Sequence, residues 1–288
     1  MTTPPAVSFE LFPPPSDEAE AGLQRTVDRL AAFDPAFVSV TYGAAGSARA
    51  RSDRIVRALL RRGDPLTAAH ITSAGATRAE VDELVRGWAE AGLRRIVALR
   101  GDAPDMTGPF RPHDDGYRNA AELVAGLRRI ADFDISVAAY PESHPDSPTV
   151  AADLDNLKRK LDAGAARAIT QYFFEAETFL RFRDRAAKAG IVAPIIPGIL
   201  PITNFAKVVE FSQRCGASVP TWLAARFEGL DDDAETRALV AATTACELCQ
   251  YLLAEGANAF HFYTLNRSTL SAAVCRMLGL RPRLMEAA

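Results

Sequence analysis

The segment VSFELFPPPS, residues 7–16, holds an acidic residue inside an otherwise apolar run. Glu10 stands among Val7, Phe9 and Leu11, and three prolines follow it at positions 13–15. A carboxylate in an apolar strand is costly to bury unless the fold has a use for it. Proline lacks a backbone N–H and restricts φ, so residues 13–15 should end the strand. We therefore predict a strand over 7–11 that places a functional carboxylate near its end.

Seven further apolar, β-branched runs follow, and amphipathic helical patterns separate them. The predicted strands are 7–11, 37–42, 66–72, 95–101, 135–141, 167–174, 193–200 and 259–265. The predicted helices are 16–33, which begins with Ser16 as N-cap, 51–62, 76–92, 118–132, 149–163, 175–189, 204–214 and 234–255. Alternating strands and helices indicate parallel strands with right-handed crossovers. The α/β pattern predicts one (β/α)8 TIM barrel over residues 1–288, with a doubly wound open sheet as the alternative.

Composition narrows the class of partner. The 288 residues are 48% hydrophobic and 24% charged, with a formal net charge of -3. This balance argues against a nucleic acid or an acidic membrane as the main partner. The first residues show no secretory signal, and the longest apolar run, 191–202, is short and interrupted by prolines. We expect a cytoplasmic protein whose four cysteines, including the CELC motif at 246–249, are free thiols rather than a redox or zinc site.

Polar side chains end seven of the eight predicted strands. Enzymes with this fold carry their active sites where the strands end and the following loops begin. The residues at these ends are Glu10, Thr41, His70, Arg100 with Asp102, Tyr140, Gln171, and Tyr263 with Asn266 and Arg267. Each has an ordinary structural explanation, but their regular occurrence at one end of the barrel predicts an active site there.

The motifs exclude some chemistries and leave others open. The sequence has no G-x-G-x-x-G motif opening a helix, no Walker A motif, and no lysine at a predicted strand end for a Schiff base. A metal-dependent lyase or hydrolase using Glu10, His70 and Asp102 remains an alternative. In the helix at 149–163, Asp153, Asn156 and Lys160 share one face. Together with the neighbouring Arg159, that face could bind a ribose and a pyrophosphate. The alternative interpretation is a helix face exposed to solvent.

Several long strings resemble one enzyme family. They are VSFELFPP, VTYGA, ALRGD, DLDNLKRKLDAGA, PGILPITNF, GLDDDAETR and FHFYTLNR. These strings, and the residues around them from about 7 to 282, closely resemble the bacterial 5,10-methylenetetrahydrofolate reductases. The resemblance implies a (β/α)8 barrel that binds FAD and takes hydride from NADH or NADPH. It further implies ping-pong reduction of 5,10-methylenetetrahydrofolate to 5-methyltetrahydrofolate, in one-carbon and methionine metabolism. We also expect a homo-oligomer.

The resemblance also assigns roles to individual residues. It implies that Glu10 is the general acid that protonates N10 as the folate ring opens, and we expect its apolar setting to raise its pKa. Asp102 is implied as a catalytic residue that acts on the flavin and contacts the pterin. The flavin-contacting positions match Thr41, Tyr42, Ala44, His70, Arg100, Gly101, Asp102, Ala120, Tyr140, His144, Asp153, Asn156, Arg159 and Lys160. The substrate-contacting positions match Glu10, Asp102, Gln171, Phe211 and Arg267.

The sequence also departs from the family's pattern. Lys207 stands where relatives can carry a folate-contacting glutamine, and we hypothesise that it meets a carboxylate of the folate tail. Ser147 replaces a frequent alanine at another flavin position. We expect no S-adenosylmethionine-binding regulatory domain and no metal. A barrel that binds folate or flavin without turnover is the third interpretation.

Overall fold

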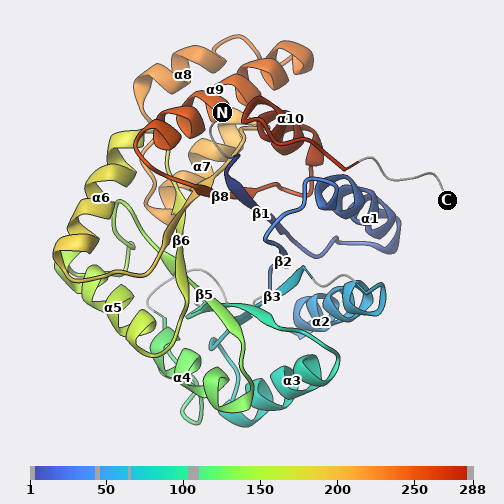
Figure 1. Ribbon diagram of the computed structural model, residues 1–288, viewed down its shortest axis with the longest axis vertical. Coiled ribbons are helices and arrows are strands. Elements are labelled where there is room, and N and C mark those ends of the chain that lie inside the picture. The colour runs from blue at the N-terminus through green and yellow to red at the C-terminus, as the bar shows by residue number, and fades with distance from the viewer. Residues whose placement is uncertain (1–3, 43–45, 64–65, 103–109, 284–288) are drawn as a thin grey trace.

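Eight parallel strands close into a barrel in sequence order, seen along its axis in Figure 1. This computed structural model describes residues 4–42, 46–63, 66–102 and 110–283. The strands are β1 (Ala6–Leu11), β2 (Phe37–Val40), β3 (Thr67–Thr72), β4 (Arg95–Leu99), β5 (Asp134–Ala139), β6 (Arg167–Tyr172), β7 (Ile195–Ile199) and β8 (Ala259–Tyr263). Every predicted strand is present. The predicted (β/α)8 barrel is confirmed, and the open-sheet alternative is wrong because β1 pairs with β8.

The helices form the outer ring. They are α1 (Asp17–Ala31), α2 (Gly46–Arg61), α3 (Arg78–Glu90), α4 (Ala120–Ile130), α5 (Val150–Asp162), α6 (Ala176–Lys188), α7 (Phe205–Cys215), α8 (Thr221–Phe227), α9 (Ala234–Ala254) and α10 (Ser268–Met277). The pattern missed α8 and α10. The seven residues of α8 are too few to establish a helical period. Ser16 caps α1 as predicted, because its side chain accepts a hydrogen bond from the Ala19 N–H at 3.4 Å.

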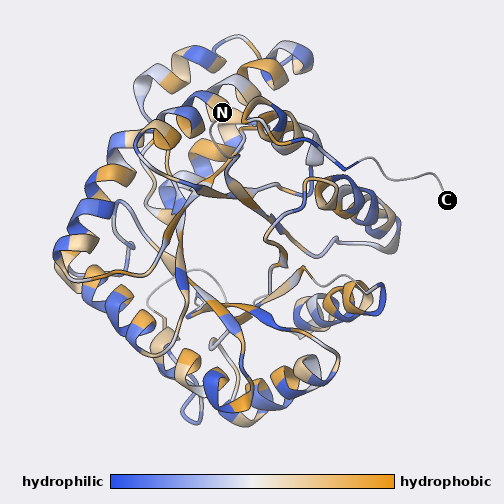
Figure 2. Cartoon of the chain, in the orientation of Figure 1, coloured by the Kyte–Doolittle hydropathy of each residue, from blue (hydrophilic) through white to orange (hydrophobic). Residues whose placement is uncertain are grey.

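Alternation along the strands explains how an apolar strand carries Glu10. Val7, Phe9 and Leu11 are buried in the main apolar cluster, which the strands share with the inner faces of the helices. Figure 2 shows these helix faces as hydrophobic and the outer faces as hydrophilic. Successive side chains of a strand point to opposite faces, so Ser8 and Glu10 point into the barrel. The alternation of side chains along β1 thus places a carboxylate inside the barrel without interrupting the apolar core.

A small apolar cluster fills the amino-terminal half of the barrel interior. It consists of Phe37, Ala68 and Ile169, with the partly buried Ile196 packed against them. Ser8 and His261 adjoin this cluster, because Ser8 pairs with Phe37 between β1 and β2 and the His261 ring centroid lies 5.7 Å from that of Phe37.

Gly198 permits the close contact between β7 and a site tyrosine. Tyr263 donates a hydrogen bond to the Thr170 carbonyl at 2.7 Å. A Cβ atom on Gly198 would lie 2.7 Å from Tyr263 Cε2 and would also meet the Thr170 carbonyl oxygen. Real Cβ atoms do not come this close to other atoms, so Tyr263 can lie across β7 only if residue 198 is glycine.

No helix in the part of the chain that the structure describes is long and apolar enough to cross a membrane. The two cysteines of the CELC motif, Cys246 and Cys249, are buried on α9 as free thiols, as predicted.

We predict that Gly198→Ala destabilises the protein by about 1–3 kcal/mol, the usual cost of overpacking a filled site. Gly22→Ala is the matched control, because its added Cβ lies in the middle of α1 and comes only within 3.8 Å of the Arg25 side chain. That control should stabilise the helix by roughly 0.5–1 kcal/mol. Urea unfolding measures both. Equal free energies of unfolding for Gly198→Ala and the wild type would contradict the steric argument.

Candidate active site

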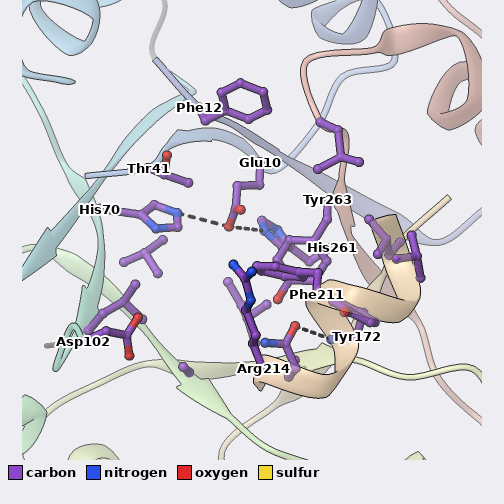
Figure 3. Close-up of a pocket in the computed structure, with 18 of the residues that line it drawn as sticks. Glu10, Phe12, Thr41, His70, Asp102, Tyr172, Phe211, Arg214, His261 and Tyr263 are labelled. Carbon is purple, nitrogen blue, oxygen red and sulfur yellow. Dashed lines mark hydrogen bonds and ion pairs between the residues drawn. The ribbon is translucent and has the colours of Figure 1, made fainter. Parts of the chain in front are cut away.

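A cavity of about 660 Å³ opens at the carboxyl ends of the strands. Figure 3 shows Glu10 at its centre, with His70 and His261 on either side and Phe211 and Arg214 entering from α7. The cavity brings together ten predicted residues: Glu10, Thr41, Tyr42, His70, Asp102, Tyr140, Gln171, Lys207, Phe211 and Tyr263. Residues at the ends of seven strands, together with α7, therefore line one cavity.

A second cavity of about 450 Å³ lies beside the first. It is lined by Arg100, Gly101, Asp102, Ala120, Tyr140, His144, Asp153, Asn156, Arg159 and Lys160, all of them predicted cofactor positions. Asp102 and Tyr140 line both cavities, so the two adjoin there. The polar face of α5 therefore lines this cavity.

Three predicted residues are not placed in this site, and one of them, Asn266, lines neither cavity and instead bonds to the backbone of Phe12. Ala44 lies outside the described residues. Arg267 is exposed just before α10 and lines neither cavity.

Glu10 is held between two histidines near the end of β1. Its Oε2 atom lies 3.5 Å from His70 Nε2 and 3.7 Å from His261 Nε2. The Glu10 backbone is fixed as well, because Thr264 Oγ1 donates a hydrogen bond to its carbonyl at 2.7 Å. Only 22% of the Glu10 side chain is exposed. The carboxylate is thus oriented from β3 and β8 as well as from its own strand.

The charge state of Glu10 differs from the expectation. Burial raises the pKa of Glu10, but a hydrogen bond with His261 and electrostatic interactions with His70 and His261 together lower it by more. The net shift is downward, so the expectation that the apolar setting raises this pKa is wrong: the setting contains two imidazoles. Burial lowers the pKa of His70 to about 4, so this histidine is neutral at neutral pH.

Arg100 organises the boundary between the two cavities. Its guanidinium donates to Asp146 at 2.7 Å and lies 3.8 Å from Asp102. Gly101, with φ of 83°, follows it in a conformation that favours glycine. A Cβ atom there would come within 2.8 Å of the Ala74 side chain. Asp102 therefore follows directly after a tight turn, and its side chain lines both cavities.

Lys160 places a buried cation at the base of the second cavity. Its side chain is buried and donates to the Ala138 carbonyl at 2.5 Å. Burial lowers its pKa to about 8, although Asp153 partly opposes this shift. Asp153 itself accepts hydrogen bonds from Ser147 Oγ at 2.8 Å and from the His144 N–H at 3.3 Å. A buried ammonium group beside a cavity favours an anionic ligand.

The structure adds site residues that the sequence reasoning missed. His261, Tyr172 and Arg214 line the main cavity. The sequence could have indicated His261, because it lies two positions before the predicted strand-end residue Tyr263 and so points to the same face of β8. Arg214 follows Lys207 by seven positions on α7, the spacing of one helix face.

The metal-dependent alternative gains no support from the geometry. Among the described residues, no three His, Cys, Asp or Glu side chains are grouped to hold a metal ion.

The fold and the two adjoining cavities define a (β/α)8-barrel protein with a ligand site at the usual end of the barrel. Residues 2–279 match the family model described as methylenetetrahydrofolate reductase, and the chain belongs to this family. It is 49% identical to the 5,10-methylenetetrahydrofolate reductase of Escherichia coli over 278 residues, which cover 96% of this chain and 92% of the relative. The Salmonella typhimurium reductase gives the same identity and coverage.

Solved structures with little sequence identity share the fold. A Clostridium thermocellum protein described as binding two copies of 5-methyl-5,6,7,8-tetrahydrofolic acid has a TM-score of 0.64 at 16% identity, covering 96% of this chain and 94% of that one. The Xanthomonas albilineans dihydropteroate synthase, solved in complex with 7,8-dihydropteroate, has a TM-score of 0.51 at 14% identity, covering 97% and 94%. At these identities the likeness extends to the barrel architecture alone.

We predict that Lys160→Met makes the ligand-free protein more stable at pH 7, by up to about 3 kcal/mol for a shift of this size. The folded-state pKa of about 8 lies below the reference value of 10.5. Below pH 8 both states are protonated, so the wild type bears the full cost of a buried charge. Between pH 8 and 10.5 only the folded state loses the proton, so wild-type stability rises with pH and the difference shrinks.

Urea unfolding from pH 6 to 10.5 measures this dependence. Lys158→Met is the matched control, because Lys158 lies on the same helix but pairs with Asp162 at 3.0 Å in a half-exposed position. A difference between wild type and Lys160→Met that is the same at every pH would contradict the prediction.

Proposed function

We propose that this protein reduces 5,10-methylenetetrahydrofolate to 5-methyltetrahydrofolate in the cytoplasm, with NADH or NADPH as donor and bound FAD as carrier. The observation that carries this proposal is the junction of the two cavities at Asp102 and Tyr140. One cavity holds a carboxylate between histidines, and the other holds a buried cation. Family membership supports the folate substrate.

The second cavity fits the flavin cofactor. Lys160 and Arg159 supply positive charge for the pyrophosphate, and the Asn156 amide and Asp153 carboxylate suit ribose or ribityl hydroxyls. In the main cavity, Thr41, Tyr42 and His70 are proposed to contact the isoalloxazine ring. When bound, FAD supplies the hydride transfer chemistry, while the protein binds and orients. The remaining proposed contacts are Arg100, Gly101, Asp102, Ala120, Tyr140 and His144, with Ala44 outside the described residues.

The main cavity is proposed to receive the nicotinamide and then the folate. Phe211 projects into it and is half exposed, so its ring is available to stack on either ligand. Gln171 offers an amide for the pterin or the nicotinamide carboxamide. Lys207 and Arg214 line the same cavity from α7, and we propose that Lys207 meets the folate tail. The substrate role of Arg267 stays a prediction, because this residue does not line the cavity. The homo-oligomeric state also stays a prediction.

Glu10 is proposed to act as the general acid on the folate. Its proton passes to N10 as the bond from N10 to the methylene carbon breaks, and the electron pair of that bond remains on N10. The carbon then becomes able to accept hydride. Asp102 is proposed to contact the pterin, and its carboxylate would lie beside the bound flavin, where it would disfavour a negative charge on the ring.

We predict that the purified protein is yellow, with a flavin spectrum that NADH or NADPH bleaches under anaerobic conditions. Adding 5,10-methylenetetrahydrofolate to the bleached protein should restore the colour and yield 5-methyltetrahydrofolate. A colourless protein whose activity needs a divalent metal would overturn the proposal in favour of a lyase or hydrolase. Failure of the folate to restore the colour would indicate a barrel that binds without turnover.

We predict that Glu10→Gln leaves the reduction of the flavin by the nicotinamide within a few-fold of wild type. It should slow the folate half-reaction by at least about 10²-fold, the usual contribution of general acid catalysis. Stopped-flow absorbance measures the two half-reactions separately. An equal loss in both would contradict the acid role and indicate a structural one.

A further inference from the structure

The side chain of Asn266 is hydrogen-bonded to both backbone groups of Phe12. Its Oδ1 atom accepts from the Phe12 N–H at 2.9 Å, and its Nδ2 atom donates to the Phe12 carbonyl at 2.7 Å. The ladder between β1 and β8 ends before this point, at the pair of Glu10 with Tyr263. The amide of Asn266 thus continues the pairing past the end of the ladder and fixes residue 12 across the closure of the barrel.

The chain that follows Phe12 offers no strand pairing of its own. Residues 13–15 are prolines, which have no N–H groups to donate. The first of them also restricts Phe12 to extended conformations. An extended chain keeps the alternation of β1, so Phe12 lies two positions after Glu10 on the same face, and both residues line the main cavity.

The loop that carries Asn266 has a conformation that is unusual for its residues. Leu265 and Asn266 have φ of 50° and 57°, in the left-handed region. Asparagine tolerates this region, but leucine rarely adopts it. Two hydrogen bonds hold the loop, because the N–H groups of Asn266 and Arg267 donate to the hydroxyl and the carbonyl of Thr264 at 3.1 and 2.9 Å. Strain that is held in place beside a cavity indicates a functional reason for the conformation.

Phe12 borders the main cavity at the side opposite α7. Its side chain is 40% exposed, as is that of Leu265, and both line the cavity. Figure 3 shows Phe12 on one side of Glu10 and Phe211 on the other. The Phe211 ring stacks on Tyr172, with ring centroids 6.2 Å apart. The cavity thus has two aromatic side chains on opposite sides: Tyr172 supports one by stacking, and Asn266 holds the other through its backbone.

We propose that Asn266 is a positioning residue that fixes Phe12 as a wall for the aryl ring of the folate substrate. The inference rests on the proposed acid role of Glu10. In a folate, N10 is bonded directly to this aryl ring, so an N10 within hydrogen-bonding reach of Glu10 leaves the ring close beside it. Phe12 stands about 7 Å further along the strand direction, the rise of two extended residues. The ring therefore passes between Phe12 and Phe211 on its way out of the cavity.

Equilibrium binding of two unreactive probes tests the wall. Tetrahydrofolate carries the aryl ring but no methylene carbon to reduce, and tetrahydropterin lacks the ring. Phe12→Ala should weaken the binding of tetrahydrofolate by at least about fivefold, the size of a lost aromatic contact, and should leave tetrahydropterin within about twofold of wild type. Anaerobic calorimetry of the flavin-loaded protein measures both affinities. Equal weakening of both probes, or of neither, would overturn the proposal.

A double-mutant cycle tests whether Asn266 acts through Phe12. Asn266→Gly removes both hydrogen bonds and still permits a positive φ. It should weaken tetrahydrofolate selectively, by no more than Phe12→Ala does. The combined variant should bind tetrahydrofolate no more weakly than Phe12→Ala, because without the ring there is nothing left to position. Additive losses would show a separate structural effect of Asn266 and overturn its positioning role.

Two further variants serve as control and substitute. Thr26→Val is the matched control, because Thr26 Oγ1 donates to the Asn266 carbonyl at 3.2 Å and its loss leaves the bonds to Phe12 in place. It should keep the wild-type ratio of the two affinities, and a fall as large as in Asn266→Gly would overturn the proposal. If Asn266→Gly does not fold, Asn266→Asp replaces it, since a carboxylate accepts from the Phe12 N–H but cannot donate to the carbonyl. An unchanged ratio in Asn266→Asp would then overturn the positioning role.

These measurements separate the wall from the proposed function. Selective loss of tetrahydrofolate affinity in a protein that does not reduce folate would support the wall and count against the proposed function alone. Folate turnover with an affinity ratio that neither Phe12→Ala nor Asn266→Gly changes would overturn the wall and leave the proposed function intact. A wild-type protein that does not bind tetrahydrofolate would overturn both.

Discussion

Closure of the barrel between β1 and β8 is the constraint on which the site depends. The pairing joins Ser8 to His261 and Glu10 to Tyr263, although Ser8 and His261 are 253 positions apart in the chain. Beyond the strands, Asn266 makes two side-chain hydrogen bonds to the backbone of Phe12, at 2.9 and 2.7 Å. These contacts hold the first and last strands in one register, and that register decides which groups surround Glu10.

Two ionisable groups sit in apolar surroundings for different reasons. Glu10 faces the imidazoles of His70 and His261, whereas Lys160 has only the Ala138 carbonyl within hydrogen-bonding distance among the described residues. A buried ammonium that Asp153 compensates only in part lowers stability until an anion binds. The second cavity is thus prepared for a negatively charged ligand at a cost to the empty protein. Such costs are typical of binding sites that are formed before their ligand binds.

Much of the fold and site could be predicted, because both follow from local patterns. The alternation of strands and helices gave all eight strands and eight of the ten described helices, and the strand ends gave Glu10, His70 and Asp102. The short α8 and the terminal α10 lacked a clear period. Arg214 was missed although it follows Lys207 by seven positions on the same face of α7. The pKa of Glu10 was predicted in the wrong direction, because its neighbours come from β3 and β8.

The sequence by itself determined the class of fold, the family and the presence of a carboxylate in an apolar strand, since periodicity and motifs are properties of consecutive residues. Only the tertiary structure decided what that carboxylate meets. Hydrogen-bond partners and charge states depend on distances of a few ångströms between residues far apart in the chain. Ser8, Glu10 and His261 become neighbours only when the barrel closes, and this contact sets the chemistry that Glu10 can perform.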